Sequence, residues 1–239
     1  MVSNAQLAQL REQGFFILED LFSAAEINEL TARIDAFSEQ HEAELQRQGQ
    51  QGISRPREIS FTTHLAEQDD FIRRFIAQPK LVAIATRILG PDVALYWDQA
   101  VYKRPEAKRD FPWHQDNGYI PVEPAEYLTC WLALADATIA NGCIWIIPGS
   151  HKHGVVEHKE TPIGKQCYFG PDPGTPVELR QGSMACFSSL MFHRSGPNLS
   201  ETIRKGYVIQ YAPAHVRHAV TGAPLARLIV ARDGQATLT

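Results

Sequence analysis

The sequence predicts a mainly β fold, a sandwich or barrel of short strands, with helices covering one face of a sheet. Residues 1–92 place apolar side chains mostly at helical spacing, whereas residues 93–214 form short runs of Val, Ile, Tyr, Trp and Phe separated by Pro, Gly, Asn and Asp. A length of 239 residues suits one β-rich domain. We therefore expect a single domain over 1–239, with a mostly helical flank (1–92), a strand-rich core (93–214) and a C-terminal tail (215–239).

Composition and charge exclude several classes of protein. Apolar residues make up 44% and charged residues 21% of the chain, which is typical of a globular protein and not of a disordered or fibrous one. The formal net charge of −4 argues against a nucleic-acid partner, which usually needs a basic surface. The apolar runs are far shorter than the ~20 residues of a membrane span, so we expect no membrane partner.

The N-terminus and the cysteines indicate the compartment. Residues 1–13 lack the basic, apolar and small-residue order of a signal peptide. The four cysteines form no C-x-x-C pair and are too sparse for a disulfide framework. We therefore expect a cytoplasmic protein with free thiols. Because nothing in the sequence demands a partner chain, we expect a monomer or weak homo-oligomer.

The helical flank divides at recognisable signals. Ser23 with Glu26 three residues later forms a capping box that starts a long helix. Pro79 interrupts a second helical region, which Gly90 and Pro91 close. The expected elements are a helix at 6–13, a strand at 15–18, a helix after Ser23, a mobile polar loop at 46–57 and a helical pair at 69–89.

The core is expected to contain short strands separated by turns. The candidate strands are 94–103, 128–135, 143–147, 183–187, 191–193 and 205–212. The longest irregular connection, 151–175, is rich in Gly and Pro, and connections of that length are often functional or mobile. The basic segment 103–110 is most simply a solvated loop; the alternative is a rim that attracts an anionic substrate such as an acyl-CoA.

A histidine and an aspartate two residues apart suggest a metal site. Alternate residues of a strand point to the same face, so His114 and Asp116 can offer a nitrogen and an oxygen to one metal. His193, at the end of a candidate strand, is a third candidate ligand. Two histidines and one carboxylate form the facial triad of non-haem Fe(II) oxygenases. The His-x-Asp pair alone is weak evidence, because buried histidines without a metal are common.

An arginine strengthens this hypothesis. Arg204 follows His193 after a strong turn signal at 195–198, and we expect a hairpin to place Arg204 beside the metal on the neighbouring strand. Arginine binds a carboxylate through a planar two-point fork. A keto acid with a second carboxylate, such as 2-oxoglutarate, would chelate the metal at one end and reach Arg204 with the other.

With these residues identified, the chain resembles the phytanoyl-CoA dioxygenase family of Fe(II)/2-oxoglutarate-dependent oxygenases. The resemblance runs from about residue 10 to 214 and includes an opening Gly14-Phe15-Phe16 segment. The core motifs, in family order, are Trp113-His114-Gln115-Asp116, Trp131 to Asp136, Asn141-Gly142-Cys143, Ile147 to His151, Gly182-Ser183, His193 to Asn198, and Arg204.

The resemblance implies a fold, an activity and roles for eight residues. The fold is a double-stranded β-helix, or jelly roll, and the reaction is hydroxylation of an unactivated C–H bond of a small molecule, with O₂ consumed and succinate and CO₂ released. The implied iron ligands are His114, Asp116 and His193. The implied 2-oxoglutarate contacts are Arg204 with Ser195 at the C5 carboxylate, Trp131 and Gln99 along the pocket, and Lys103, whose role is less defined. Related halogenases replace the carboxylate ligand by a small residue, so Asp116 favours oxidation over halogenation.

One alternative is a cupin-type metal site. His151, His153 and Glu157 partly match the first cupin metal motif, and cupins share the jelly-roll scaffold. The glycine that should begin the motif is replaced by Trp145, and the second cupin motif is not met. We therefore consider this site much less favoured than the triad.

A second alternative is an inactive jelly-roll module that only binds a small molecule, since fold does not fix function. Such a module would be expected to lose a triad member or the arginine, and all four are present. For the substrate pocket the sequence suggests Phe61, Tyr102, Trp113 and Phe192 as lining. Arg55 and Arg57 are candidates to contact a substrate carboxylate or phosphate when their loop closes.

Overall fold

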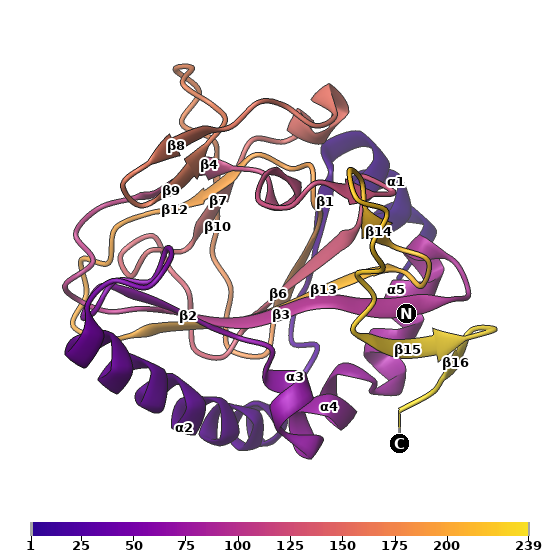
Figure 1. The fold of residues 1–239 in the computed structure, drawn as a ribbon, viewed down its shortest axis with the longest axis horizontal. Coiled ribbons are helices and arrows are strands. Elements are labelled where there is room, and N and C mark those ends of the chain that lie inside the picture. Colours follow the sequence, from indigo (N-terminus) through magenta and orange to yellow (C-terminus); the bar gives the residue numbers. More distant parts are fainter. Residues whose placement is uncertain (1, 239) are drawn as a thin grey trace.

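Two antiparallel sheets face each other in the computed structural model, which describes residues 2–238 (Figure 1). The larger sheet has eight strands, in the order β1-β11-β6-β13-β3-β15-β16 with β2 beside β3. Its strands are β1 (Phe15–Leu18), β2 (Ile59–Thr63), β3 (Val93–Lys103), β6 (Leu128–Ala133), β11 (Met184–Ser188), β13 (Arg204–Pro213), β15 (Leu228–Arg232) and β16 (Gln235–Ala236). The smaller sheet contains β10 (Thr175–Val177), β7 (Ile144–Ile146), β12 (His193–Ser195) and β4 (Phe111–His114).

Both faces of the larger sheet are covered, which explains why its central strands are continuous apolar runs. Every residue of β6 and β11 is buried. On the inner face, Trp131 and Val208 pack with Ile144 of the smaller sheet. On the outer face, Leu132 and Ile209 belong to the cluster that the helices complete. The mainly β prediction is confirmed, and the arrangement is a jelly roll with flanking helices.

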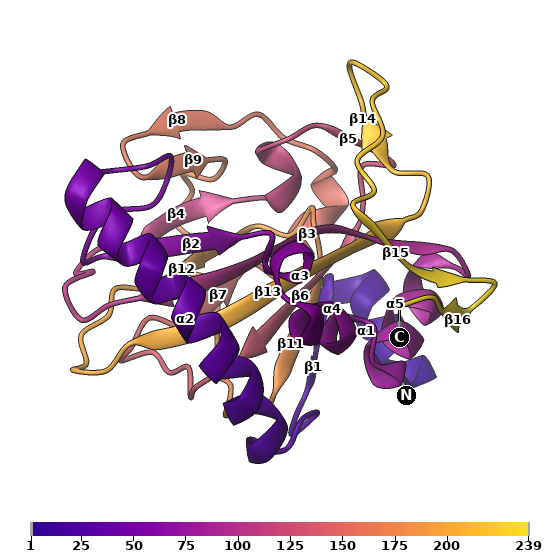
Figure 2. The same ribbon diagram turned by 60° about the horizontal axis from the view of Figure 1, so that its bottom comes forward.

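The helices are α1 (Asn4–Gln13), α2 (Ala24–Gln48), α3 (Leu65–Gln68), α4 (Asp70–Ile76) and α5 (Pro79–Leu89). Ser23 and Glu26 form the expected capping box at the start of α2. One face of α2 is apolar and packs against the larger sheet, along which the helix runs diagonally (Figure 2). Pro79 is the first residue of α5, where its missing N–H leaves no hydrogen bond unmade.

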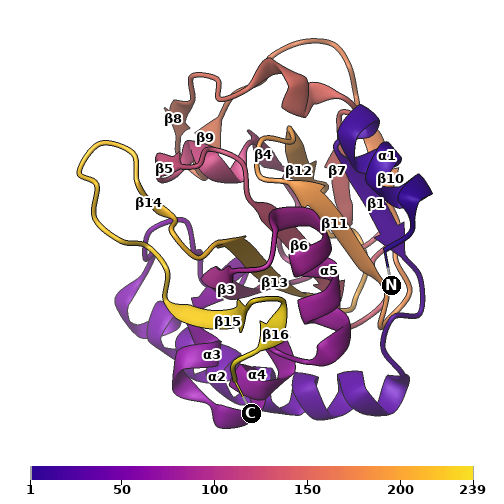
Figure 3. The same ribbon diagram turned by 90° about the vertical axis from the view of Figure 1, so that its right-hand side faces the viewer.

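The expected division into flank, core and tail does not match the sheet boundaries. From the flank, β1 pairs with β11 and β2 pairs with β3, and β15 from the tail also pairs with β3. Residues 215–239 therefore include sheet strands, and β15 and β16 lie beside α5 (Figure 3). The sequence analysis did not predict β2 or β15, because each is a short run next to strong loop signals.

The remaining elements are short and belong to connections. They are η1 (Asp116–Gly118), β5 (Val122–Glu123), η2 (Ser150–His153), β8 (Lys159–Thr161), β9 (Gly164–Gln166) and β14 (Arg217–His218). The connection 151–175 thus carries a turn of helix and the β8–β9 hairpin. Within residues 2–238, none of the helices has the length and apolar character that crossing a membrane requires.

Candidate metal centre and adjoining pockets

The inner face of the larger sheet forms the floor of the candidate site. Three rows of paired residues on β3, β13 and β6 make up this floor: Lys103 with Arg204, Gln99 with Val208 and Trp131, and Trp97 with Gln210 and Thr129. The three rows share a face because they lie an even number of residues apart and side chains alternate along a strand. From Arg204 to Gln210 the floor extends over about 20 Å of strand. It therefore runs from a basic end to a polar and aromatic end.

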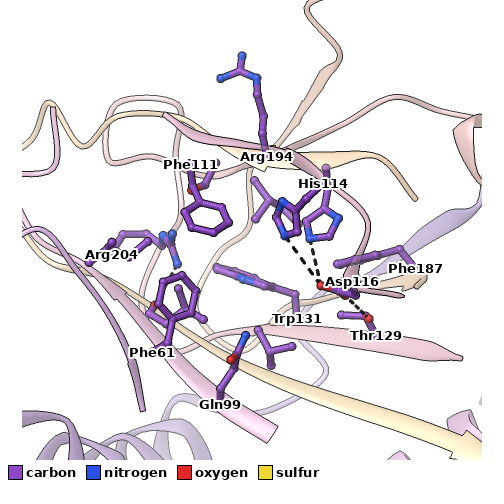
Figure 4. Close-up of a pocket in the computed structure, with 16 residues that line it drawn as sticks. Phe61, Gln99, Phe111, His114, Asp116, Thr129, Trp131, Phe187, Arg194 and Arg204 are labelled. Carbon is purple, nitrogen blue, oxygen red and sulfur yellow. Dashed lines mark hydrogen bonds and ion pairs between the residues drawn. The ribbon is translucent and has the colours of Figure 1, made fainter. Parts of the chain in front are cut away.

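The three candidate metal ligands lie above this floor. His114 ends β4 and His193 starts β12, and these two residues are paired across the smaller sheet with ring centroids 4.1 Å apart. The Asp116 Oδ1 atom lies 3.9 Å from His114 Nε2 and 3.5 Å from His193 Nε2. All three donor atoms lie within 4.8 Å of one another, so one ion can contact them together (Figure 4).

Hydrogen bonds to the backbone fix the orientation of the two imidazole rings. His114 Nδ1 lies 2.8 Å from the Pro112 carbonyl oxygen, and His193 Nδ1 lies 3.1 Å from that of Met191. A carbonyl only accepts, so each Nδ1 carries the proton and each Nε2 lone pair is directed to the shared centre. Burial, and then the neighbouring His193, hold the pKa of His114 well below its ordinary value. The imidazole is therefore neutral, which is the form that binds metals.

Thr129 orients the third ligand. Its hydroxyl donates to Asp116 Oδ2 at 2.6 Å, which leaves Oδ1 directed toward the two imidazole nitrogens. Two imidazoles and one anchored carboxylate oxygen suit Fe(II), so the residues present fit an iron ion. The sequence analysis missed Thr129, although a single threonine in the otherwise apolar run Leu128–Ala133 was an available signal.

Asp116 reaches the site in a different way from the one expected. Strand β4 ends at His114, and Asp116 begins the helical turn η1, so alternation along a strand does not bring the pair together. Gln115, between them, is buried and joins its own segment to residues 154–156 and to Leu190. Its amide donates to the carbonyls of Gly154 and Leu190 and accepts from the Val156 N–H. This packing fixes the chain direction between the two ligands.

Arg204 closes the basic end of the floor. The side chain is 1% exposed, and it donates to the backbone carbonyls of Gly142 and Val101 at 3.2 and 3.0 Å. Among the described residues it has no carboxylate partner. Burial lowers the pKa of its guanidinium to about 10, so the group stays charged at neutral pH. A buried cation without a counter-charge is costly, which indicates that an anionic ligand completes this end of the pocket.

The expected hairpin placement of Arg204 was wrong. Arg204 begins β13 of the larger sheet, whereas His193 begins β12 of the smaller sheet, so the two residues lie on opposing sheets. Arg204 and the metal centre still line one cavity, which we call the Arg204 pocket. In Figure 4, Trp131 lies on the floor between Arg204 and His114.

Lys103 supports the wall of the Arg204 pocket. Its ammonium donates to the Ser195 hydroxyl at 3.1 Å and to the carbonyl of Gly196. Burial, and then the charge of Arg204, lower the pKa of Lys103 to about 7. Gln99, Trp131, Ser195 and Arg204 all line the pocket, whereas Lys103 lies behind Ser195.

A glycine keeps the Arg204 pocket open. A Cβ atom at Gly206 would overlap the indole ring of Trp131, which lies over β13 at this point. We expect Gly206→Ala to displace the indole, to lower the free energy of unfolding by roughly 1–3 kcal/mol and to weaken binding of a carboxylate ligand in the pocket. Thermal unfolding and 2-oxoglutarate titration measure the two effects. Ala133→Gly, which only removes a methyl group from the neighbouring strand, is the control for destabilisation without this overlap. Equal 2-oxoglutarate affinity in wild type and Gly206→Ala would contradict the prediction.

A second, larger cavity of about 300 Å³ opens from the metal centre toward the other end of the floor. We call it the aromatic pocket. Its lining is Ile53, Phe61, Tyr96, Trp97, Gln99, Phe111, His114, Asp116, Tyr119, Ile120, Tyr127 and Gln210. Of the four pocket residues suggested by the sequence, only Phe61 is in this set. Tyr102 points to the helix side, where it donates to Asp35, whereas Trp113 and Phe192 pack against Tyr168.

The loop and basic segment flagged by the sequence lie beside the pockets. Ile53 of the loop lines the aromatic pocket, whereas Arg55 faces a separate narrow cleft with Arg109. Arg55 is 9% exposed, and its Nη1 has no hydrogen-bond partner among the described residues. In the basic segment, Arg104 pairs with Glu42 and Arg109 with Glu58, so these two cations are neutralised within the chain.

The cupin-type alternative finds no support in the structure. His151 Nε2 lies 3.1 Å from the Arg11 carbonyl oxygen, and the His153 ring stacks on Phe192. Glu157 is not brought together with either histidine as a metal-binding group in the described part of the chain.

Comparisons with known proteins identify the family of the chain. The sequence profile of the family described as "Phytanoyl-CoA dioxygenase (PhyH)" matches residues 10–206. "Phytanoyl-CoA dioxygenase domain-containing protein 1" of Bos taurus is 27% identical over 264 residues, covering 89% of this chain and 91% of that protein.

Solved structures show the same fold. The structure of EvdO2 from Micromonospora carbonacea var. aurantiaca complexed with 2-oxoglutarate superimposes with a TM-score of 0.71 at 20% identity, covering 94% of this chain and 96% of that one. The epimerase SnoN in complex with Fe3+, alpha ketoglutarate and nogalamycin RO gives a TM-score of 0.70 at 20% identity, covering 94% and 93%. At this level of identity the likeness concerns the fold.

Proposed function

The chain belongs to the phytanoyl-CoA dioxygenase family, and from this membership we propose that it hydroxylates an unactivated C–H bond of a small-molecule substrate. It is a non-haem dioxygenase that uses Fe(II), 2-oxoglutarate and O₂. The observation that carries the proposal is the convergence of two imidazoles and an anchored carboxylate in one cavity with a buried arginine that has no carboxylate partner among the described residues.

We assign the roles of the site residues as follows. His114, Asp116 and His193 hold the iron. Arg204, assisted by Ser195, binds the C5 carboxylate of 2-oxoglutarate, while Trp131 and Gln99 line the path from that carboxylate to the metal. Lys103 positions Ser195 through its hydrogen bonds.

Bound iron supplies the oxidation of the C–H bond by O₂, coupled to decarboxylation of 2-oxoglutarate; the protein supplies position and a dry site. The Thr129 hydroxyl holds the Asp116 carboxylate, and backbone carbonyls hold the two imidazoles. Phe111 and Phe187 pack against the rings of His114 and His193, with centroids 5.1 and 5.0 Å apart, and exclude water from the ligands.

Thr129 gives a test of the metal geometry that does not remove a ligand. We expect Thr129→Val to weaken Fe(II) binding roughly 10–100-fold, because the Asp116 carboxylate loses the hydrogen bond that orients it. Thr129→Ser should restore most of the affinity. Thr62→Val, on β2 outside both pockets, is the matched control. Equal Fe(II) affinity in Thr129→Val and wild type would remove this role.

The type of reaction is tested with labelled oxygen. A panel of small molecules is first screened for substrate-dependent succinate release, and any active compound is then incubated under ¹⁸O₂. Hydroxylation places one oxygen atom of O₂ in succinate and the other in the product. If succinate carries the label but the product is unsaturated or cyclised and unlabelled, the reaction is another oxidation and not hydroxylation.

The protein's organisation and location are further parts of the proposal. The four cysteines are free in the described structure, which supports a reducing compartment, and we propose a cytoplasmic location. We also propose a single domain that acts as a monomer or weak homo-oligomer. One hydrophobic cluster includes residues from the flank, the core and the tail, which supports a single domain.

A further inference from the structure

The aromatic pocket contains two glutamines whose amide orientations are determined by their neighbours. The Trp97 Nε1–H, which can only donate, lies 3.1 Å from Gln99 Oε1. The oxygen of Gln99 is therefore occupied, and its NH₂ group remains to donate into the pocket. Gln99 Nε2 has no hydrogen-bond partner among the described residues.

A second chain of hydrogen bonds orients Gln210 in the opposite sense. Thr129 gives its only proton to the Asp116 carboxylate, so toward Gln210 its oxygen must accept. Gln210 Nε2 lies 3.5 Å from that oxygen. The amide oxygen of Gln210, which is 5% exposed and lines the pocket, thus remains as an acceptor. The pocket presents one donor and one acceptor on neighbouring strands.

The rest of the lining offers no charge to a substrate. Apart from the candidate metal ligands His114 and Asp116, the described residues that line the pocket are uncharged. The phenols stay neutral, because burial raises the pKa of Tyr96 to about 12 and that of Tyr127 well above its usual range. The lining itself offers a substrate anion no counter-charge. The positive charge of a bound iron ion would already be offset by Asp116 and the two carboxylates of 2-oxoglutarate.

The aromatic rings are also poorly placed to bind a cation. Arg227 already lies 5.3 Å from the Trp97 ring centroid and pairs with Glu67, and Lys165 lies 5.8 Å from that of Tyr119. Tyr96 and Tyr127 pack on each other with centroids 4.9 Å apart. Ring faces that already contact cations or other rings offer little further cation–π attraction.

We propose that the aromatic pocket takes an uncharged substrate and that Gln99 and Gln210 orient it through a hydroxyl or carbonyl group. This inference rests on the proposed function, because it assigns the primary substrate class of the same site. A hydroxyl satisfies both groups: it accepts from Gln99 Nε2 and donates to Gln210 Oε1. The two residues are diagonal neighbours on β3 and β13, within reach of one bound group.

The test is equilibrium binding of four matched probes to the anaerobic Fe(II)·2-oxoglutarate complex, measured by calorimetry. The probes are 2-naphthol, naphthalene, 2-naphthoate and N-methylquinolinium, which share a two-ring frame and differ in polar group and charge. We expect 2-naphthol to bind most tightly, at least about tenfold better than naphthalene, since one hydrogen bond is worth roughly that factor. The anion and the cation should bind more weakly still.

Variants identify the residues responsible. Gln210→Met, outside the Arg204 pocket, should reduce the preference for 2-naphthol over naphthalene by about tenfold. Gln99→Met should do the same, with its 2-oxoglutarate affinity measured alongside because Gln99 lines both pockets. Gln40→Met, exposed on α2, is the control and should leave the preference unchanged.

Three outcomes would overturn the inference. These are tighter binding of 2-naphthoate than of 2-naphthol, tighter binding of the cation than of 2-naphthol, and no binding of any probe. Repeating the titrations on the metal-free protein separates this inference from the proposed function. If the protein prefers 2-naphthol but forms no complex with Fe(II) and 2-oxoglutarate, the proposed function is wrong and the substrate class stands. If it forms that complex but does not prefer 2-naphthol, the substrate class is wrong and the proposed function stands.

Discussion

Replacing Asp116 by alanine should abolish Fe(II) binding and, with it, 2-oxoglutarate turnover. The variant leaves only two imidazoles, and it removes the negative charge that offsets the metal ion. Because Asp116 is partly exposed and begins a short turn, the loss of its side chain should leave the fold intact. Metal binding by calorimetry and succinate release should both fall below detection.

Asp70→Ala is the matched control for this result. Asp70 is an exposed carboxylate of α4 that pairs with Arg73, far along the chain from the candidate ligands. It should bind iron and turn over 2-oxoglutarate as the wild type does. Retention of iron-dependent activity in Asp116→Ala, or in His114→Ala tested alongside, would remove the triad assignment.

Arg204→Ala should raise the apparent KM for 2-oxoglutarate roughly 30-fold or more, while the KM for the primary substrate changes little. Loss of a buried ionic contact costs about 2–5 kcal/mol, which sets the expected size. Since the guanidinium has no carboxylate partner in the described protein, its removal leaves no internal counter-charge unpaired.

Two further variants make the arginine result specific. Arg204→Lys keeps a charge and loses the two-point fork, so it should show an intermediate KM. Arg180→Ala, at an exposed ion pair with Asp20, should match the wild type. An unchanged 2-oxoglutarate KM in Arg204→Ala would remove the clamp role.

The sequence predicted the site better than it predicted the path of the chain to the site. His114, Asp116 and His193 are residue types that can bind iron, and the structure brings them together. Their order along the chain with Arg204 suggests 2-oxoglutarate as the cosubstrate. Their three-dimensional relation was not accessible from spacing alone. Alternation along a strand does not place Asp116, which lies in a turn, and a hairpin does not place Arg204, which lies on the opposing sheet.

The pocket linings were predicted poorly for a related reason. Whether an aromatic residue such as Tyr102 or Trp113 faces a cavity depends on strand register, and register is set by pairing with distant strands. On β3, Tyr102 points to the helices while Gln99 lines the Arg204 pocket, and a one-residue change of register would exchange their faces. Likewise, β15 joins the larger sheet through tertiary pairing that its own sequence does not indicate.

The most direct test of the central claim is an anaerobic titration of the metal-free protein with Fe(II) and 2-oxoglutarate, followed by visible absorption. We expect a weak charge-transfer band that needs both additions, because the keto acid must chelate an iron held by His114, Asp116 and His193. The band should be absent in Asp116→Ala. Tight metal binding that gives no band, and that is indifferent to 2-oxoglutarate, would contradict the account.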